Sequence, residues 1–522
     1  MARATGVAAS LLLFAGCASG NSRPPAPAGR PVKEDAPPAS PANPLPAPAN
    51  PDGRKADVGK GHTGTGVLSL ETQDAPAQEP TWGHESSTSY LIPAVEIVIF
   101  EYLLNLYDRN YDAEDAYRTN YSTIRSNLQH GWIIDDDPFA TNQVMHPYQG
   151  SLSQGFARSA GLSYWESLGY VAGGAALWEV AGETGSPSFN DMVTTTFGGS
   201  FLGEVLFRMA SLLLESGSPD PGILRRTGAF VISPSTGFNR LAFGDRFDGI
   251  YPSHEAAAFV RFGAGVRRNA RLNDLGALAD APREEFVADV SMEYGLPGKP
   301  GYEYTRPFDY FQFEAAATSS SGALPESIMT RGLLFGSAYE VTDSYRGIWG
   351  LYGSYDYISP EVFSVSSTAL SLGTTGQLQI SDSVTLQGSI LGGFGWTAVG
   401  TIADAQTDRD FHYGFSPQGL AAFRIIGGDV AMLDMQGRAY YIGGLYSSDT
   451  TSKETILRGQ VALTLRVYGH HALGLQFVST VRNSNFFDVE GGLEEVGAVS
   501  LFYTYVADTD FGAVDWRDVG RP

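Results

Sequence analysis

The chain has 522 residues and a formal net charge of −23 at pH 7. This acidity argues against nucleic acid as a partner, because the phosphate backbone would repel the protein. Aromatic residues make up 12% of the chain, charged residues only 17%, and 62 residues are glycine. This composition indicates a β-rich architecture with many turns.

The N-terminus has the layout of an export signal, residues 1–17. Arg3 precedes an apolar run over residues 7–14, and the small residues Ala15 and Gly16 follow. The ending "FAGC" resembles a bacterial lipobox, which implies that Cys17 is lipidated and becomes the mature N-terminus. Cys17 is the only cysteine, so an intramolecular disulfide and a cysteine-based zinc site are excluded. The alternative is an ordinary signal peptide with an incidental cysteine.

Proline and alanine dominate the next segment, residues 18–87. Such a composition cannot bury a core. We expect a disordered tether, partly in the polyproline II conformation, with an extended reach on the order of 200 Å.

Residues 88–216 are predicted to form a helical module of three or so helices, followed by a connecting segment over residues 217–255. The stretches are "LIPAVEIVIFEYLLNLYDRN", "GFARSAGLSYWESLGYVAGGAALWEVAG" and "MVTTTFGGSFLGEVLFRMASLLLE". Before the third helix, "SPSFND" offers N-caps at Ser188, Asn190 and Asp191. Two glycine pairs at helical spacing, Gly169 with Gly173 and Gly199 with Gly203, predict close helix packing. Because charged residues punctuate these helices, a packed periplasmic domain is favoured over a membrane helix pair.

Residues 256–507 alternate between apolar and polar side chains, the period of a β-strand. In "ETILRGQVALTLRVYG", for example, Leu457, Leu463 and Leu465 fall on one face and Arg458 and Arg466 on the other. About twelve segments of this kind have the length that a tilted strand needs to cross an outer membrane. Their predicted cores are 256–267, 285–294, 308–318, 329–341, 346–358, 364–380, 384–398, 410–425, 429–443, 455–468, 471–482 and 496–507.

The fold class that follows is mainly β with an α-helical module: an antiparallel outer-membrane β-barrel of about twelve strands. Tyrosines near strand ends on the apolar face suit an interfacial girdle, namely Tyr355, Tyr357, Tyr503 and Tyr505. A soluble β-sandwich or lipocalin-like barrel is the alternative. A C-terminal tail, residues 508–522, is atypical of such barrels; either it hangs in the periplasm or the last strand is misplaced.

A barrel of this size has room for one helix at most. The helical module is therefore expected to cap the periplasmic mouth or to lie beside the barrel, with one segment inserted at most. The predicted interior charges are Asp356, Asp434, Arg438, Arg458 and Arg466. They either line a wet lumen or form a closed ion-pair network without transport, and the pattern does not separate these two interpretations.

The stretch "DDDPFATNQVMHPYQGS" gathers acids, amides and a histidine at the start of the second helical region. Together with "WEVAGE" and "SPSFND" it resembles a bacterial family known only as a domain of unknown function, whose members look exported and outer-membrane-associated. The resemblance covers about residues 130–205 and implies no activity. The matching positions are Asn142, Gln143, His146, Pro147, Tyr148, Gly150, Arg158, Glu166, Trp178, Glu179, Pro187, Ser188, Asn190 and Asp191.

Three chemical interpretations of this stretch remain. A metal site could draw on His130, Asp135, Asp136, Asp137 and His146, but their spacing matches no known metal motif. An enzyme could use His146 as a general base oriented by Asp137 or Glu166, with lipid or peptidoglycan fragments as substrates. The favoured interpretation is a structural clamp, with an extended turn at His146–Pro147 and amides that satisfy backbone groups.

The leading prediction is thus an outer-membrane, lipoprotein-like barrel of a Gram-negative bacterium with a structural or passage role. We expect a non-enzyme that uses no cofactor or metal and has outer-membrane lipid as its partner, and the sequence leaves any periplasmic or envelope protein partner unidentified. The alternatives are a membrane-embedded hydrolase that uses His146 and a soluble periplasmic domain that binds a ligand.

Overall fold

The computed structural model describes residues 88–111, 115–134, 137–216, 221–247, 256–272, 283–321, 325–360, 363–401, 411–443, 453–485 and 492–515. The predicted export signal, Cys17 and the proline-rich tether lie outside the described residues, as do Asp135 and Asp136.

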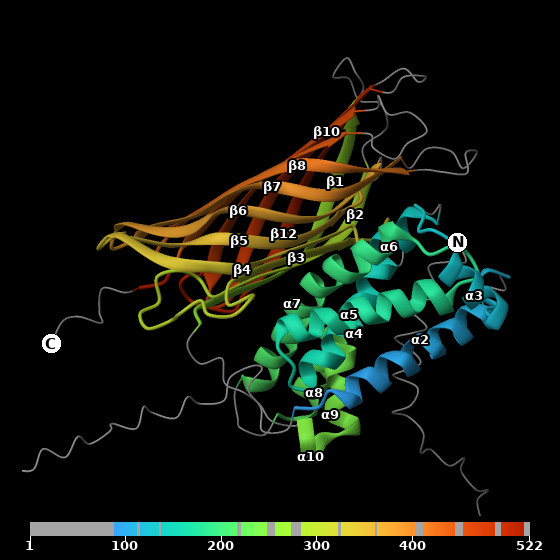
Figure 1. The fold of residues 1–522 in the computed structure, drawn as a ribbon. Helices are drawn as coiled ribbons and strands as arrows, with labels where there is room; N and C mark the ends of the chain where they lie inside the picture. Colours follow the sequence, from blue (N-terminus) through green and yellow to red (C-terminus); the bar gives the residue numbers. More distant parts are fainter. Residues whose placement is uncertain are drawn as a thin grey trace, which may run out of the picture. The chain divides into compact units, whose positions relative to one another are not determined.

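Twelve antiparallel strands close into a barrel (Figure 1). Each strand pairs with its neighbours in the sequence, and β1 closes the ring by pairing with β12. All twelve predicted segments overlap an observed strand, so the prediction of a twelve-stranded barrel is confirmed. The strands are β1 (Ala258–Leu272), β2 (Arg283–Tyr294), β3 (Phe311–Thr318), β4 (Ser327–Thr342), β5 (Tyr345–Ile358), β6 (Phe363–Ser381), β7 (Val384–Thr401), β8 (Phe411–Gly427), β9 (Ala431–Gly443), β10 (Lys453–Tyr468), β11 (His471–Asn485) and β12 (Leu493–Val506).

The two faces of the strands separate as the alternation predicts. On β10, Leu457, Leu463 and Leu465 are exposed on the outside, while Arg458 and Thr464 are buried. Successive side chains of a strand point to opposite faces, so the buried set fills the barrel interior.

Ion pairs cross the lumen from one wall to another. Arg438 on β9 donates to the carboxylate of Asp356 on β5 at 2.7 Å. Arg424 on β8 pairs with Glu293 on β2 at 2.9 Å, and these two strands stand half-way round the twelve-strand ring from one another. Arg424 also donates to Asp434, at 2.6 Å. Side chains that reach across in this way occupy the space that an open channel would need.

The other two predicted interior charges lie in different surroundings. Arg458 is buried in the lumen, and its guanidinium donates to the Thr480 hydroxyl at 3.0 Å. Arg466 lies at one mouth of the barrel, where it donates to the backbone carbonyls of Asp429 (2.7 Å) and Thr509 (3.0 Å).

The described part of the C-terminal tail, residues 508–515, lies against the barrel and belongs to no strand. Strand β12 ends at Val506, and Phe511 and Val514 are then buried against interior side chains that include Phe259 and Met432. Gln377 on β6 holds both backbone groups of Val514, with its amide oxygen accepting at 3.0 Å and its nitrogen donating at 2.5 Å. The two apolar side chains explain this placement, because the barrel end gives them a surface on which to be buried.

In the described part, nine α-helices precede the barrel, more than the three or so expected. Three of them lie in the segment predicted as a connection, and short 3₁₀- and π-helical segments (η) divide the others. The elements are α2 (Leu91–Tyr111), η1 (Asp115–Tyr117), α3 (Tyr121–Gln129), η2 (Thr141–Met145), α4 (His146–Ser159), α5 (Tyr164–Leu177), η3 (Trp178–Gly182), α6 (Phe189–Val193), η4 (Thr194–Gly198), α7 (Gly199–Glu215), α8 (Ile223–Ile232), α9 (Pro234–Ala242) and α10 (Gly244–Phe247).

Helix α4 is the centre of this module, with nearly all of its residues buried among α2, α5, α7 and α9. One of the two glycine pairs explains how α7 approaches it. A Cβ on Gly199 would lie 2.7 Å from the Cα of Gly150, and one on Gly203 would lie 2.8 Å from the carbonyl oxygen of Ser151. The other pair does not: a Cβ on Gly169 or Gly173 would meet nothing within 4 Å. The prediction of close packing is therefore correct for α7 and wrong for α5.

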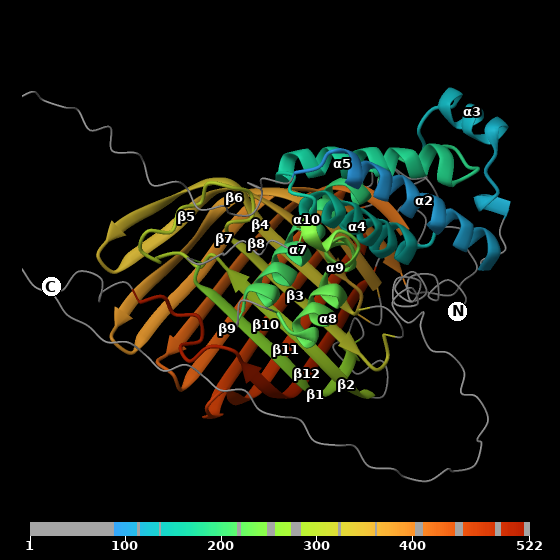
Figure 2. The same cartoon turned by 90° about the horizontal axis from the view of Figure 1, so that it is seen from below.

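The helical module lies beside the barrel, against the outer wall, and no described helix enters the lumen (Figures 1 and 2). Trp165 of α5 stacks on Phe335 of β4 with ring centroids 5.1 Å apart, and Phe335 points outward. Tyr355 and Tyr357 also point outward, but the helices bury them, whereas Tyr503 and Tyr505 remain exposed. Only part of the predicted tyrosine girdle is therefore free on the surface.

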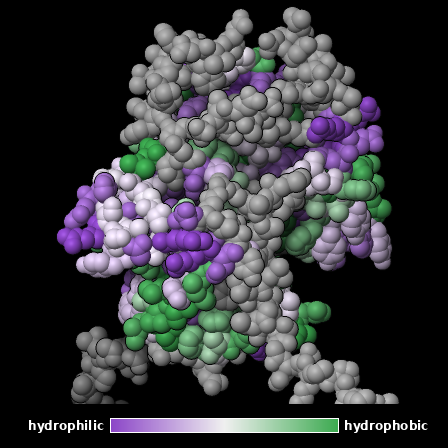
Figure 3. All heavy atoms as spheres, turned by 90° about the vertical axis from the view of Figure 1, so that its right-hand side faces the viewer, coloured by the Kyte–Doolittle hydropathy of each residue, from purple (hydrophilic) through white to green (hydrophobic). Residues whose placement is uncertain are grey.

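The surface of the helical module is itself partly apolar. On α2, the exposed residues include Leu91, Val95 and Val98, and the side of the molecule in Figure 3 shows hydrophobic patches beside hydrophilic ones. The helical stretch Phe189–Glu215 is long and apolar enough to cross a membrane, although 67% of its most apolar window is buried inside the protein.

Candidate functional site

From Phe139 to Ser151 the family-like stretch is helical, with no turn at His146–Pro147. His146 has helical backbone angles (φ −62°, ψ −48°), which overturns the expected extended conformation before Pro147. Segment η2 is π-helical and ends where Pro147 enters the first turn of α4. Proline has no N–H to donate, and the change of helical register at this point accommodates the missing hydrogen bond.

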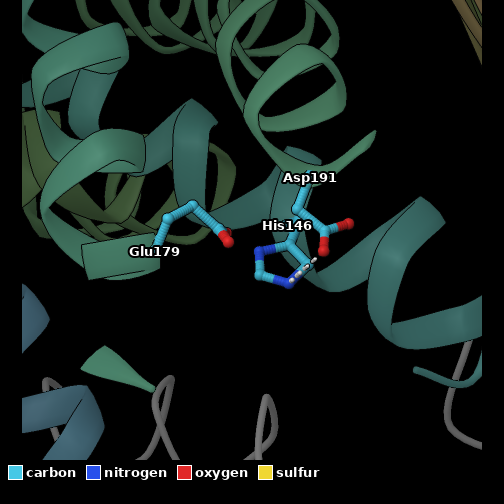
Figure 4. Close-up of side chains that lie close together, drawn as sticks. All are labelled: His146, Glu179 and Asp191. Atoms are coloured by element: carbon cyan, nitrogen blue, oxygen red, sulfur yellow. Dashed lines mark ion pairs between the residues drawn. The ribbon is translucent and has the colours of Figure 1, made fainter. Parts of the chain in front are cut away.

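His146 meets two carboxylates in the interior of the module. Its Nε2 lies 3.8 Å from Oδ2 of Asp191. One ligand atom each from His146, Glu179 and Asp191 lie within 4.8 Å of one another. The three residues are only 4%, 3% and 1% exposed. Figure 4 shows the carboxylates of Glu179 and Asp191 on either side of the His146 ring.

Each of the three residues is placed by an irregular part of a helix. His146 follows η2, Glu179 lies within η3, and Asp191 lies in α6 just before η4. Extra residues in a helical turn rotate the following side chains away from the regular helical face, and such π-helical segments occur frequently at functional sites. Three of them converge on this cluster.

Neighbouring polar groups hold the two carboxylates. The backbone N–H of Ser188 donates to Oε2 of Glu179 at 2.7 Å, and the Asn190 amide donates to Oδ1 of Asp191 at 3.0 Å. The Ser188 hydroxyl caps α6 by accepting from the Asp191 N–H at 3.2 Å, so the N-cap predicted from "SPSFND" is confirmed at Ser188. The orientation of the site is therefore built into the start of α6.

The same stretch also bonds directly to the barrel. The hydroxyl of Tyr413 on β8 accepts from Gln143 at 2.9 Å and from Asn190 at 3.0 Å. The hydroxyl of Tyr355 on β5 donates to the Gln143 backbone carbonyl at 2.5 Å. Tyr413 lies two residues from the exposed Phe415, so it belongs to the outer face. The amides thus join the module to the barrel wall.

A second buried network surrounds Glu204 of α7. Arg158 of α4 and Arg208 of α7 both donate to its carboxylate, at 2.7 and 2.9 Å, and Arg208 reaches Asp309 in the β2–β3 connection at 3.3 Å. The family-like position Arg158 therefore has a structural partner, as does Gly150, which lets α7 approach α4. Trp178 is buried and donates from its indole N–H to Glu183 at 2.9 Å.

Other contacts hold the two residues predicted to orient His146. Asp137 is half-buried, and its backbone carbonyl accepts from Asn142 at 3.5 Å. Glu166 closes the capping box at the start of α5, where the Ser163 N–H holds the pKa of Glu166 below its ordinary value. The proposed metal ligand His130 bonds instead to Ser126 of its own helix, at 2.7 Å.

Glu179 and Asp191 were named in the sequence as family-like positions, but not as partners of His146. Their grouping depends on how α4, η3 and α6 pack, and no local spacing encodes it. Among the described residues, this is the one group of three or more His, Cys, Asp or Glu side chains close enough to hold a metal ion. Such a set can bind a cation, share protons or support an imidazole base.

A family model for a domain of unknown function, DUF3943, matches residues 131–235. The resemblance to a family of unknown function is thereby confirmed over this part of the chain. The search of curated proteins gave no match.

Solved structures similar to this chain include two porins and the protein OpdO. The NanC porin is 6% identical, with 46% of this chain and 98% of that chain covered and a TM-score of 0.25. OpdO of Pseudomonas aeruginosa is 9% identical, with 48% of this chain and 98% of that chain covered and a TM-score of 0.17. The KdgM porin is 10% identical, with 46% of this chain and 98% of that chain covered and a TM-score of 0.19. At these TM-scores the likeness carries no argument about function.

Proposed function

We propose that the chain is an outer-membrane β-barrel protein whose barrel is a sealed scaffold that holds the helical module against its outer wall. The observation that carries this proposal is the distribution of side chains across the barrel wall. Apolar residues face outward, while ion pairs such as Arg438–Asp356 and Arg424–Glu293 cross the lumen between strands that are not neighbours.

The outward face fits a lipid environment. A row of directly paired residues runs across five neighbouring strands: Leu433, Leu463, Leu475, Leu501 and Val266. Soluble monomers rarely expose contiguous apolar patches larger than a few hundred Å². The same outward polarity argues against the soluble ligand-binding alternative, because the polar face of that barrel would have to point outward.

The lumen fits a closed barrel better than a passage. The Arg438–Asp356 and Arg424–Glu293 pairs bridge walls that are not neighbours, and Phe511 and Val514 fill one end. Each partner of such a pair is buried, and separating them would leave a charge in a low-dielectric interior. A structural role in the envelope is therefore favoured over transport.

Conductance across planar lipid bilayers tests the sealed state. The purified full-length protein, first shown by heat-modifiable migration in detergent gels to be folded, is compared with an open porin. We expect insertion without conductance steps, whereas the porin gives steps under the same conditions. Stable, reproducible steps from the folded protein would reject the sealed barrel.

Lipidation of Cys17 is a separate part of this proposal. The support is the "FAGC" sequence at the end of an apolar export-signal pattern, with the only cysteine of the chain in the acylated position. A Cys17→Ser variant is expected to lose incorporation of a labelled fatty acid. Equal labelling of the two proteins would reject the lipoprotein part and leave the barrel proposal untouched.

A hydrolase that uses His146 is the second candidate function. The supporting observation is the pair of buried carboxylates beside the imidazole, since a carboxylate orients a catalytic histidine and stabilises its protonated form. His146→Gln keeps some hydrogen-bonding capacity but cannot act as a comparable base near neutral pH. If His146→Ala and His146→Gln both fold, insert and lose the cellular phenotype equally, the catalytic candidate replaces the structural one.

A further inference from the structure

The cluster of His146, Glu179 and Asp191 supports an inference that goes beyond the sealed-scaffold proposal. An imidazole and two carboxylates are gathered in the interior of a mostly helical, tightly packed module. Two carboxylates held this close together in a buried site repel one another, so a bound cation between them would stabilise the arrangement.

The surroundings fix the carboxylates in the way that ligands of a metal are fixed. One oxygen of Glu179 accepts from the Ser188 N–H, and one oxygen of Asp191 accepts from the Asn190 amide. Hydrogen bonds from groups that do not touch the metal orient the ligands of a metal site and contribute to its affinity for the metal. The second oxygen of Asp191 faces His146, and Figure 4 shows the Glu179 carboxylate directed toward the ring from the other side.

The distances are close to those of a metal site. Ligands about 2.1 Å from a tetrahedral zinc ion are about 3.4 Å from one another. The Nε2–Oδ2 distance of 3.8 Å is near that value, and the widest separation among the three donor atoms is within 4.8 Å. A combined side-chain movement of at most about 1.4 Å, to which the three rotatable bonds of Glu179 can contribute, would bring the set to the tetrahedral separation.

We propose that His146, Glu179 and Asp191 bind one divalent transition-metal ion of the zinc type. The chemistry of the donors selects this class. Imidazole nitrogen with carboxylate oxygen suits Zn²⁺ and its first-row neighbours, whereas Ca²⁺ and Mg²⁺ prefer oxygen ligands alone. Three protein ligands also leave a fourth position for water or another ligand.

The test uses full-length protein in detergent, purified without a polyhistidine tag and stripped with a chelator. Zn²⁺ alone is titrated by calorimetry, and bound metal is counted by mass spectrometry after dialysis. We expect about one Zn²⁺ per chain and a rise in the unfolding temperature on binding, because a ligand that binds only the native state stabilises it. No binding, or binding without any rise in the unfolding temperature, would overturn the proposal.

Matched variants locate the ion. Asp191→Asn and Glu179→Gln keep the size of each side chain and remove its charge. Each is expected to weaken Zn²⁺ binding at least ~10-fold, because losing even a group that only supports the metal ligands typically costs that much affinity. Glu101→Gln changes another buried carboxylate of the module and is expected to bind Zn²⁺ normally. A double variant, His470→Gln with His471→Gln, removes a histidine pair at the barrel mouth and is also expected to bind normally. Unchanged affinity in both cluster variants, or lost binding in the histidine-pair variant, would overturn the assignment.

If the cluster variants fail to fold, a measurement on the native protein takes their place. X-ray absorption at the zinc edge of the loaded wild-type chain reports the ligands directly. One imidazole among oxygen ligands is the expected spectrum, and a spectrum without histidine, or with two, would contradict the site.

Discussion

Both the barrel lumen and the helical module bury charge, but they balance it in different ways. In the lumen, arginines meet carboxylates of neighbouring and of distant strands, as Arg424 meets both Asp434 and Glu293. Where the module meets the barrel, Arg158 and Arg208 balance Glu204 of α7 and Asp309 of the β2–β3 connection. The His146 cluster differs, because it sets two carboxylates against one imidazole. The comparison teaches that charge pairing serves stability in the lumen and around Glu204, while the His146 cluster, which gathers two carboxylates around an imidazole, is where a ligand is to be sought.

The largest effect is expected from breaking the charge balance inside the lumen. Arg438→Ala removes the partner of Asp356 and leaves a buried carboxylate, which typically costs about 3–5 kcal/mol. Unfolding by urea in detergent measures the loss. The matched control is Arg438→Met combined with Asp356→Leu, which removes both charges and is expected to recover much of the stability. Equal losses in the two proteins would show that the charge balance is not what holds the lumen.

A charge on the outer face tests the other side of the same wall. Leu463→Arg is expected to cost about 2–4 kcal/mol if the site lies near the bilayer midplane. The measurement is folding into lipid vesicles, with Leu463→Ala as the control for the lost side chain. Labelling of single cysteines gives the polarity independently: a cysteine at Leu463 that is open to water, with one at Arg458 in lipid, would reverse the assignment of the faces.

The two glycine pairs of the module have the same helical spacing, but only one of them lies in a close helix contact, so substitutions in the two pairs test the effect of the contact. Gly199→Ala forces a Cβ against Gly150, and overpacking of this kind typically costs about 1–3 kcal/mol. Gly173→Ala meets open space and should change the stability little, or raise it slightly, because alanine favours the helix. Thermal unfolding of the module followed by circular dichroism compares them, and a larger loss for Gly173→Ala would mean that α7 does not approach α4 as described.

The smallest expected effect concerns the contact between module and barrel. Tyr413→Phe removes the hydroxyl that accepts from Gln143 and Asn190, and the loss of such a buried acceptor typically costs about 1–3 kcal/mol. Tyr441→Phe, on the same outer face but exposed, is the control. Protease resistance of the helical module reports the difference. Equal resistance in the two variants would indicate that the amides do not join the module to the wall.

Local patterns predicted the strands of the barrel and the presence of a helical module before it, but not the number of helices or how they pack. A period of two is a property of each strand by itself, so all twelve strands and the inward side of Arg438 and Asp356 could be predicted from the sequence. The contact between Arg438 and Asp356 depends on the positions of two non-neighbouring strands in the closed ring. The sequence of a single strand does not encode those positions. The buried tail at Phe511 is likewise a tertiary effect.

The candidate site shows the same limit. Glu179 and Asp191 could be named as family-like positions, yet the orienting role was predicted for Asp137 and Glu166, which are nearer to His146 in the chain. The positions of η3 and α6 in the packed module bring the distant carboxylates of Glu179 and Asp191 to His146. The pair Gly169 and Gly173 has the same spacing as the pair Gly199 and Gly203. The two pairs differ only in that α4 lies against the second pair.

The central claim is that the helical module rests on the outer wall of the barrel, and a cysteine pair tests it most directly. A Cβ on Gly198 of η4 would lie 2.9 Å from Oγ1 of Thr368 on β6, a separation that a disulfide can bridge. In a Cys17→Ser background, Gly198→Cys with Thr368→Cys is expected to form a disulfide in intact cells, while Gly173→Cys with Thr368→Cys stays reduced. A folded, membrane-inserted protein in which the Gly198–Thr368 pair stays reduced and both thiols react with maleimide would contradict the account.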